Sequence, residues 1–234
     1  MCPDLEVEDH VEVRCSLRLE ELMIYTALAS HKEFEPNEKL LILRYALMDL
    51  RKIDTSEKAV FKNAKKIRKK LESFYEERPE VYQLIQREKD TPSTKYARAK
   101  ELLEERIRNG DATLVFTSHT ECIHDPLVEF LGAARTTKID GEVTKGIVIE
   151  GANYFDTDAD LALTERDIQI LEFQTNPDKF IALTSYGKLR EGRSLVKANN
   201  VLRLQREYRP GWEEQGFGRT ARPGQTKPRV TGYD

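Results

Sequence analysis

Two arginines in the last part of the sequence could bind a phosphate group. Arg219 and Arg222 stand three residues apart, directly after Gly218, and a Pro-Gly pair that predicts a turn follows Arg222. We expect them on one face of a helix, where that helix ends. A guanidinium group keeps its charge and can donate two parallel hydrogen bonds to phosphate oxygens. The alternative is a pair of ordinary arginines on a solvated helix face.

Three other groupings could support chemistry, and a structural interpretation is favoured for each. His119, Cys122 and His124 lack a second ligand pair for zinc, and no third group is in place to orient Cys122 as a nucleophile. The acidic stretch 156–160 alternates like a calcium loop, but the glycine and the closing glutamate of that motif are misplaced. Trp212 could stack on a nucleic-acid base, or pack against the preceding strand. We therefore predict no metal site.

Bulk composition narrows the class of protein. The 234 residues suit one large domain, or one domain with an appendage. A net charge of −3 excludes a uniformly basic nucleic-acid binder, so any such surface must be local. No apolar run is long enough to span a bilayer, and the acidic first residues lack the apolar core of a secretory signal. The three cysteines, far apart and odd in number, favour a reducing compartment.

Residues 1–92 are predicted to form an entry segment followed by a helical protrusion. The basic run within 62–70 has two interpretations, a solvated helix face or a contact to the DNA backbone. The expected elements are a loose segment at 1–10, a short strand at 11–15, helices at 17–30 and from Pro36 to Leu50, and a long-helical, highly charged segment from 55 to 90.

Residues 93–234 are predicted to form one α/β domain, because helices and apolar β-rich runs alternate along them. Residues 142–163 break that alternation and are interpreted as an insertion. The expected strands are 112–118, 136–139, 180–185, 200–204 and the beginning of one at 229–231; the expected helices are 95–108, one ending at Leu131, 164–174 and one from Trp212 onward.

Taken in order, these pieces resemble the second RecA-like lobe of the Swi–Snf family of DNA translocases. The resemblance is clear over 93–141 and 164–229, and loose over 11–90. Lys188, Arg190 and Arg193 crowd a loop that the family usually builds from glycine, which is a departure from its pattern. The matching motifs are Val115–Ser118, Ile139–Gly141, Glu165–Asp167 with Phe173-Gln174, Leu183–Asn200, and Gln215 followed by Gly218-Arg-x-x-Arg-x-Gly-Gln225.

This resemblance implies a RecA-like parallel sheet flanked by helices, with an N-terminal helical appendage. In the family ATP lies between two lobes, so Arg219 and Arg222 would stabilise charge on the transferring phosphoryl group. Gln215 and Gln225 would orient these arginines, and Gly192 would let the backbone approach the nucleotide. Contacts to the DNA backbone would come from Thr117, Ser118, Thr184, Ser185 and Arg203.

A complete motor of this kind also needs a Gly-x-x-x-x-Gly-Lys-Ser/Thr loop and an acidic Mg²⁺ site. No Gly-Lys pair in the sequence is followed by Ser or Thr. We therefore expect the chain alone to bind no ATP tightly and to hydrolyse none, and to be one lobe of a longer protein. ATP and Mg²⁺ would be bound only together with an N-terminal RecA-like lobe.

The expected partners are that N-terminal lobe, the backbone of double-stranded DNA and chromatin proteins, with no membrane. The resemblance implies a nuclear protein in a eukaryote and a cytoplasmic one otherwise. Two alternatives stay open: a degenerate lobe that acts as a protein-interaction scaffold and docks through 55–90, and an unrelated α/β enzyme of flavodoxin-like shape.

Overall fold

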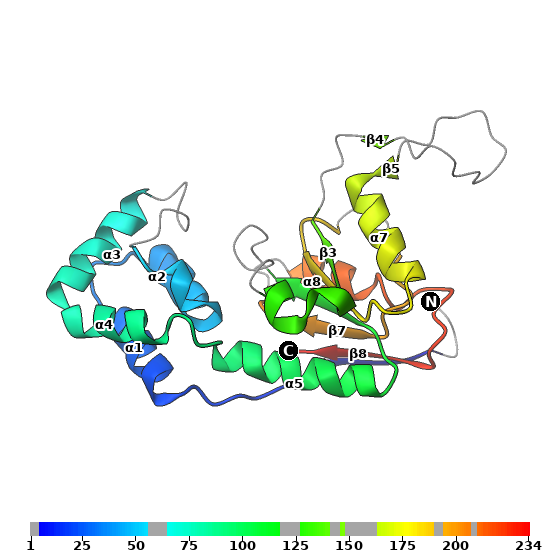
Figure 1. The fold of residues 1–234 in the computed structure, drawn as a ribbon, viewed down its shortest axis with the longest axis horizontal. Coiled ribbons are helices and arrows are strands. Elements are labelled where there is room, and N and C mark those ends of the chain that lie inside the picture. The colour runs from blue at the N-terminus through cyan, green and yellow to red at the C-terminus, as the bar shows by residue number, and fades with distance from the viewer. Residues whose placement is uncertain are drawn as a thin grey trace. The chain divides into compact units, whose positions relative to one another are not determined.

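The chain divides into two compact units. One unit consists of residues 1–13 together with 102–234, and the other of residues 14–101. The predicted boundary at residues 92 and 93 thus falls inside the second of these units. The computed structural model describes residues 5–55, 65–117, 127–140, 146–147, 163–189, 194–206 and 210–234 (Figure 1).

The first unit is organised around a six-stranded sheet with the order β1-β8-β7-β2-β6-β3, in which every pairing is parallel. All side chains of β2 and β6 are buried, which explains why these strands read as continuous apolar runs rather than alternating ones. The predicted parallel α/β fold is therefore confirmed. The strands are β1 (Glu6–Val11), β2 (Thr113–Thr117), β3 (Thr136–Ile139), β6 (Ile181–Ser185), β7 (Asn200–Arg203) and β8 (Arg229–Tyr233).

Strand β1 corrects the sequence-based prediction for the first residues. Residues 6–11, predicted to be largely loose, pair in parallel with β8, from Glu6 beside Arg229 to Val11 beside Tyr233. The predicted strand at 11–15 is wrong beyond Val11. Most side chains of β1 are exposed, so no apolar pattern marks the strand, and its backbone pairing with β8 holds it.

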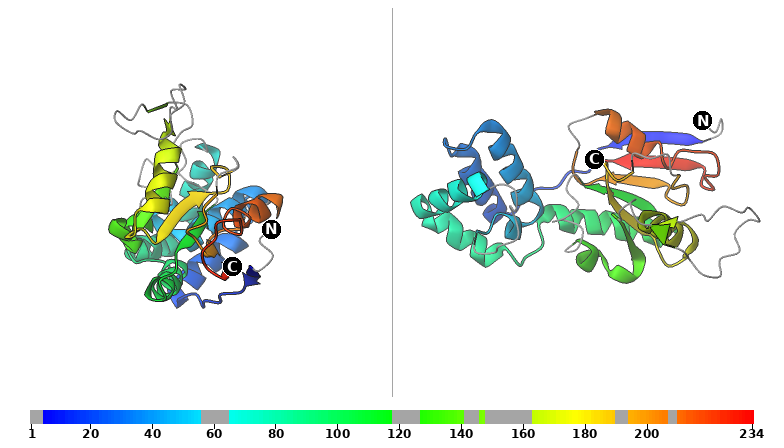
Figure 2. Two further views of the ribbon diagram at one scale, coloured as in Figure 1. Left: turned by 90° about the vertical axis from the view of Figure 1, so that its right-hand side faces the viewer. Right: turned by 90° about the horizontal axis from the view of Figure 1, so that it is seen from above.

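Helices flank the sheet (Figure 2). They begin and end at local sequence signals. Thr164 and Asp167 form a capping box at the start of α7, in which each side chain accepts a hydrogen bond from the other residue's backbone N–H. Gly132 ends the helical residues 127–131 with a positive φ of 93°. The named helices are α5 (Thr94–Arg108), which crosses the division between the units, α7 (Glu165–Thr175) and α8 (Pro210–Phe217).

Within the predicted insertion the structure describes one short antiparallel pair, β4 (Gly146–Ile147) with β5 (Leu163–Thr164). Several sequence-based predictions fall outside the described residues. These are the roles of Ser118 and Gly192, the interpretations of His119, Cys122 and His124, and the acidic stretch 156–160.

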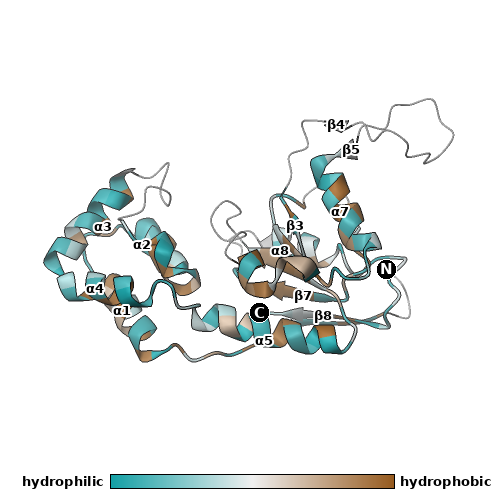
Figure 3. Cartoon of the chain, viewed as in Figure 1, coloured by the Kyte–Doolittle hydropathy of each residue, from teal (hydrophilic) through white to brown (hydrophobic). Residues whose placement is uncertain are grey.

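The second unit is helical, with a core that includes Leu28, Ile42, Leu71, Phe74 and Ile85. In the described ranges no helix is both long and apolar enough to cross a bilayer. Figure 3 shows α3 largely in the hydrophilic colour. The helices are α1 (Leu19–Ser30), α2 (Pro36–Met48), α3 (Lys65–Glu77) and α4 (Pro79–Glu88).

In its described part, the segment predicted to be long-helical from 55 to 90 consists of two helices, α3 and α4. Pro79 stands at the first position of α4, and the ring of a proline disfavours helical backbone at the residue before it. Arg78 accordingly has φ −129° and ψ 63°, which separates α3 from α4. Part of the basic run pairs within the unit, because Lys70 Nζ lies 2.6 Å from a carboxylate oxygen of Glu38.

Candidate functional site

Arg219 and Arg222 lie beyond α8 rather than on it. The helix ends at Phe217, and both arginines stand in the turns that follow. The expectation that they share a helix face is therefore wrong, while the predicted break of the helix into a loop is confirmed. The Pro-Gly turn is formed as the sequence indicates, because Gly224 has a φ of 96°, which favours glycine.

Both arginines are fixed to neighbouring segments. Arg222 donates from Nε to the carbonyl of Gly218 at 2.9 Å and from Nη1 to the hydroxyl of Ser194 at 3.1 Å. Arg219 is only 6% exposed, and its carbonyl accepts a hydrogen bond from the backbone N–H of Leu195 at 2.8 Å. Burial, and then the positive charge of Arg222, lower the pKa of Arg219. The two cationic groups therefore interact with each other.

Gln225 anchors the backbone of the arginine loop, which we define as the turns from Gly218 to Gln225. Its Nε2 donates to the carbonyl oxygens of Ala198 and Thr220, at 2.9 and 3.1 Å, and its Oε1 accepts from the backbone N–H of Lys227 at 3.1 Å. Any effect of Gln225 on the arginines thus passes through the backbone. Gln215 is exposed on α8, and its proposed role stays a prediction.

The contact between α8 and the sheet depends on a glycine. A Cβ atom at Gly216 would lie 2.8 Å from Cζ of Phe116, closer than real Cβ contacts come. The Phe116 ring in turn stacks on Tyr186, with centroids 4.5 Å apart and planes inclined by 10°. Because the two rings support each other within the core, Phe116 has little room to withdraw.

Replacing Gly216 with alanine is therefore expected to lower the free energy of unfolding by about 1–3 kcal/mol, the usual cost of overpacking. Gly211 offers a matched control, since it lies in the same helix and a Cβ there meets nothing within 4 Å. Gly211→Ala should be neutral or stabilise by up to about 1 kcal/mol. Denaturant unfolding of both variants checks this, and equal stabilities would contradict the packing argument.

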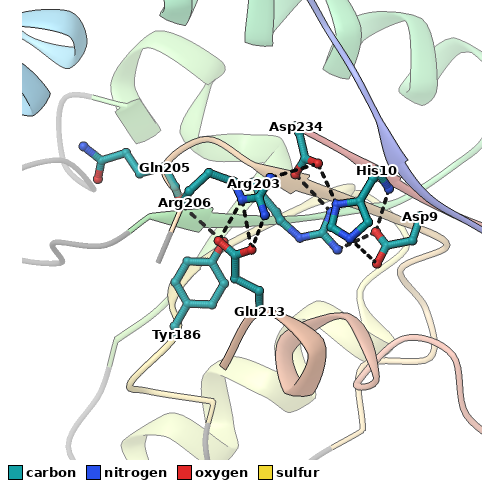
Figure 4. A network of polar contacts seen from close by, with 8 residues as sticks. All are labelled: Asp9, His10, Tyr186, Arg203, Gln205, Arg206, Glu213 and Asp234. Atoms are coloured by element: carbon teal, nitrogen blue, oxygen red, sulfur yellow. Dashed lines mark hydrogen bonds and ion pairs between the residues drawn. The ribbon is translucent and has the colours of Figure 1, made fainter. Parts of the chain in front are cut away.

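A chain of alternating charges runs from β1 to α8 (Figure 4). Arg203 donates to Asp9 and, at 3.2 Å, to Asp234. The other carboxylate oxygen of Asp234 lies 3.3 Å from Nη1 of Arg206. Arg206 then donates from Nε to both carboxylate oxygens of Glu213, each at 2.9 Å. Five charged residues from four segments are thus linked in series, and we call this set, from Asp9 to Glu213, the charge chain.

The end of the charge chain formed by Asp9 and Arg203 is tightly packed. Arg203 is only 3% exposed, so its charge needs the nearby carboxylates. The Asp9–Arg203 pair has room because residue 232 is glycine. A Cβ atom at Gly232 would collide with Oδ1 of Asp9 and come within 3.0 Å of Nη1 of Arg203. The guanidinium of Arg203 also lies over the ring of Phe217, 5.5 Å from its centroid. Arg203 thus contacts both the first strand and the last residue of α8.

The charge chain shifts the pKa of two of its members, Asp234 and Arg206. Burial opposes ionisation of Asp234, but the hydrogen bond from His10 and the charges of Arg203 and Arg206 outweigh it, so the pKa of Asp234 is lowered. The hydrogen bond to Glu213 raises the pKa of Arg206. Sequence analysis missed this chain, because its members are distant in sequence and carry no common motif.

The other predicted DNA contacts lie at the carboxyl ends of two central strands. Thr117 ends β2 and pairs in register with Ser185, which ends β6 beside Thr184. All three are buried, and the Thr184 hydroxyl donates to the carbonyl of Ile139 at 2.8 Å. Ligands of open parallel sheets bind outside the carboxyl ends of the strands, which is where these residues lie. DNA contact by them and by the internally paired Arg203 stays a prediction.

Two weaker sequence signals are also located. Trp212 packs against the core of the first unit, as its structural interpretation expects. Among the described residues no group of three or more His, Cys, Asp or Glu side chains could hold a metal ion.

Comparison with solved structures shows which class of proteins shares this fold. The C-terminal part of the Fun30 ATPase domain matches with a TM-score of 0.60 and 17% identity, over 98% of this chain and 84% of that one. The C-terminal domain of the Sulfolobus solfataricus SWI2/SNF2 ATPase matches with 0.52 and 18%, over 97% and 79%. The core of a SWI2/SNF2 ATPase from the same organism, in complex with double-stranded DNA, matches with 0.51 and 21%, over 99% and 41%.

The sequence comparison points to the same class. The chain is 30% identical over 143 residues to the chromatin-remodeling ATPase INO80 of Neurospora crassa. That match covers 61% of this chain and 6% of INO80, so the chain corresponds to a small part of that protein's length. No family model matches. The fold is that of the C-terminal lobe of a Swi2/Snf2-type ATPase, and the resemblance drawn from the motifs is confirmed.

Proposed function

We propose that this chain is the C-terminal lobe of a Swi–Snf-type ATP-dependent DNA translocase. In this proposal Arg219 and Arg222 act on ATP that a separate N-terminal lobe holds. The observation that carries it is the joining of two predicted motifs. The arginine loop is hydrogen-bonded to the segment after β6 through Ser194, Leu195 and Ala198.

The charge of the loop suits an anionic ligand. Two guanidinium groups of like charge repel each other, and burial, followed by this repulsion, lowers the pKa of Arg219. A phosphoryl group placed between them would offset that repulsion, most strongly where negative charge develops in the transition state. The hydrogen bonds of Arg222 to Gly218 and Ser194 would keep its side chain near the orientation needed.

Mg²⁺ and most phosphate contacts are assigned to the N-terminal lobe in this proposal. The donor sets of the described residues do not suit a metal ion, since no cluster of three or more His, Cys, Asp or Glu exists among them. Double-stranded DNA is the proposed second ligand, in keeping with the neighbour solved with it. The likeness to a chromatin-remodeling ATPase supports action on chromatin, and hence in the nucleus of a eukaryote.

The chain by itself is expected to release no phosphate from ATP above background, with or without DNA, because the phosphate-binding wall lies on the other lobe. When an N-terminal RecA-like lobe of this class is joined to it, DNA should stimulate hydrolysis. A phosphate-release assay on both forms, with the N-terminal lobe alone as control, tests the proposal. Robust hydrolysis by the isolated chain would contradict it.

A second candidate function is a protein-interaction scaffold built on a degenerate lobe. The observation that favours it is the apolar surface of α1, whose residues Leu19, Leu22 and Met23 are exposed although the opposite side of the helix is buried. A groove of about 870 Å³ beside α4 includes Leu22 and Met23 in its wall. For a scaffold, Arg222→Ala should leave every activity of the protein unchanged.

A further inference from the structure

We propose that Glu213 is a positioning residue for the arginine pair, and that the charge chain from Asp9 to Glu213 determines how firmly it holds α8. The inference rests on the proposed function for its catalytic consequence, but its structural part stands on the contacts alone. Glu213 lies in the first turn of α8 and is 5% exposed, although it carries a charge. A carboxylate there also interacts favourably with the helix dipole.

The ion pair between Arg206 and Glu213 is geometrically specific. Nε lies 2.9 Å from both carboxylate oxygens, and Nη2 lies 2.8 Å from one of them. A forked pair of this kind fixes direction as well as distance. Arg206 stands three residues beyond Arg203, the last residue of β7. The pair therefore ties the start of α8 to the sheet.

The far end of α8 carries this constraint to the arginines. Gly216 seats the helix on Phe116, and Gly218 and Arg219 follow within one turn. With the helix seated at that point, the Arg206–Glu213 pair restricts rotation of α8 about the contact. Such a rotation would move the carbonyl oxygen of Arg219 away from the backbone N–H of Leu195, from which it accepts a hydrogen bond at 2.8 Å.

The remaining members of the chain modulate this hold (Figure 4). Asp234 is shared, since one of its carboxylate oxygens faces Arg203 and the other faces Arg206. Asp9 supplies the second carboxylate to Arg203. If Asp9 loses its charge, Arg203 depends more on Asp234 and draws it away from Arg206. Strand β1, which contributes Asp9, is thus coupled to α8 through three intervening side chains.

The first test measures hydrogen exchange in the isolated 234-residue polypeptide by mass spectrometry. Glu213→Gln should raise exchange in peptides that cover 214–222 by about tenfold or more, since hydrogen bonds to charged groups contribute on that scale. Peptides of β2 should be unchanged, which separates local loosening from global unfolding. Asp9→Asn should give a smaller rise in the same peptides.

Glu214→Gln is the matched control, because Glu214 is exposed on the same helix and one position away. It should leave exchange unchanged. Equal exchange in Glu213→Gln and Glu214→Gln would overturn the structural part of the proposal, whatever the chain's function.

The second test uses the protein with its N-terminal lobe and measures DNA-stimulated ATP hydrolysis. Glu213→Gln should lower kcat by about tenfold with KM for ATP unchanged, because positioned charge acts mainly in the transition state. Glu213→Asp, which keeps the carboxylate, should regain part of the loss. Faster exchange with an unchanged kcat would overturn the positioning role. Failure of the proposed function is distinct, because it would appear as an unchanged rate in the Arg222→Ala variant.

Discussion

Replacing Arg222 with alanine is expected to lower DNA-stimulated ATP hydrolysis by about 10³-fold when this chain is joined to the N-terminal lobe of the proposed function. Arginines that contact a transferring phosphoryl group in related NTPases contribute about 10³–10⁵ in rate. The effect should fall mainly on kcat, because the charge they neutralise develops in the transition state. Steady-state phosphate release at saturating DNA measures it.

Two further variants separate charge from folding. Arg222→Lys keeps a cation but loses the planar fork, so it should recover only part of the rate. Arg229→Ala is the control, because this arginine pairs with Glu8 at a site where both side chains are about half exposed, and it should hydrolyse ATP normally. Thermal unfolding of each variant shows whether losing the bonds to Gly218 and Ser194 affects stability. An unchanged rate in Arg222→Ala would leave the scaffold as the better account.

Elements with a strong local signal were predictable from the sequence. The central strands β2 and β6 are continuous apolar runs because both of their faces are covered. Helix α7 was marked at its start by Thr164 and Asp167, which cap it in the structure. The last motif also predicted the break after α8, because Gly218 and the Pro223-Gly224 pair oppose further helix.

Features that depend on distant residues were not predictable. Strand β1 has mostly exposed side chains and exists through pairing with β8. Asp9 and Arg203 are 194 positions apart, and nothing in either neighbourhood indicates the other. The contact of Ser194 with Arg222 was not predicted either, because spacing along the chain does not reveal it.

Loss of the Arg203 side chain is expected to lower the free energy of unfolding of the first unit by about 3–5 kcal/mol, the usual cost of removing one partner of a buried ion pair. Arg203→Met keeps much of the volume, so the loss reflects charge more than a cavity. Asp9 would lose its arginine partner, while Asp234 would keep Arg206 and His10. Urea unfolding followed by fluorescence measures the change.

The probe reports on the right unit, because Trp212 is the only tryptophan and packs against the core of the first unit. Arg229→Ala should cost less than about 1 kcal/mol, as exposed pairs do. Adding Asp9→Asn to Arg203→Met should restore part of the stability, because it removes the carboxylate left without its partner. A loss below about 1 kcal/mol in Arg203→Met would mean that Arg206 and His10 satisfy Asp234 unaided. Arg203 would then be dispensable to the charge chain, and β1 would be linked to Asp234 through His10 instead of through Asp9 and Arg203.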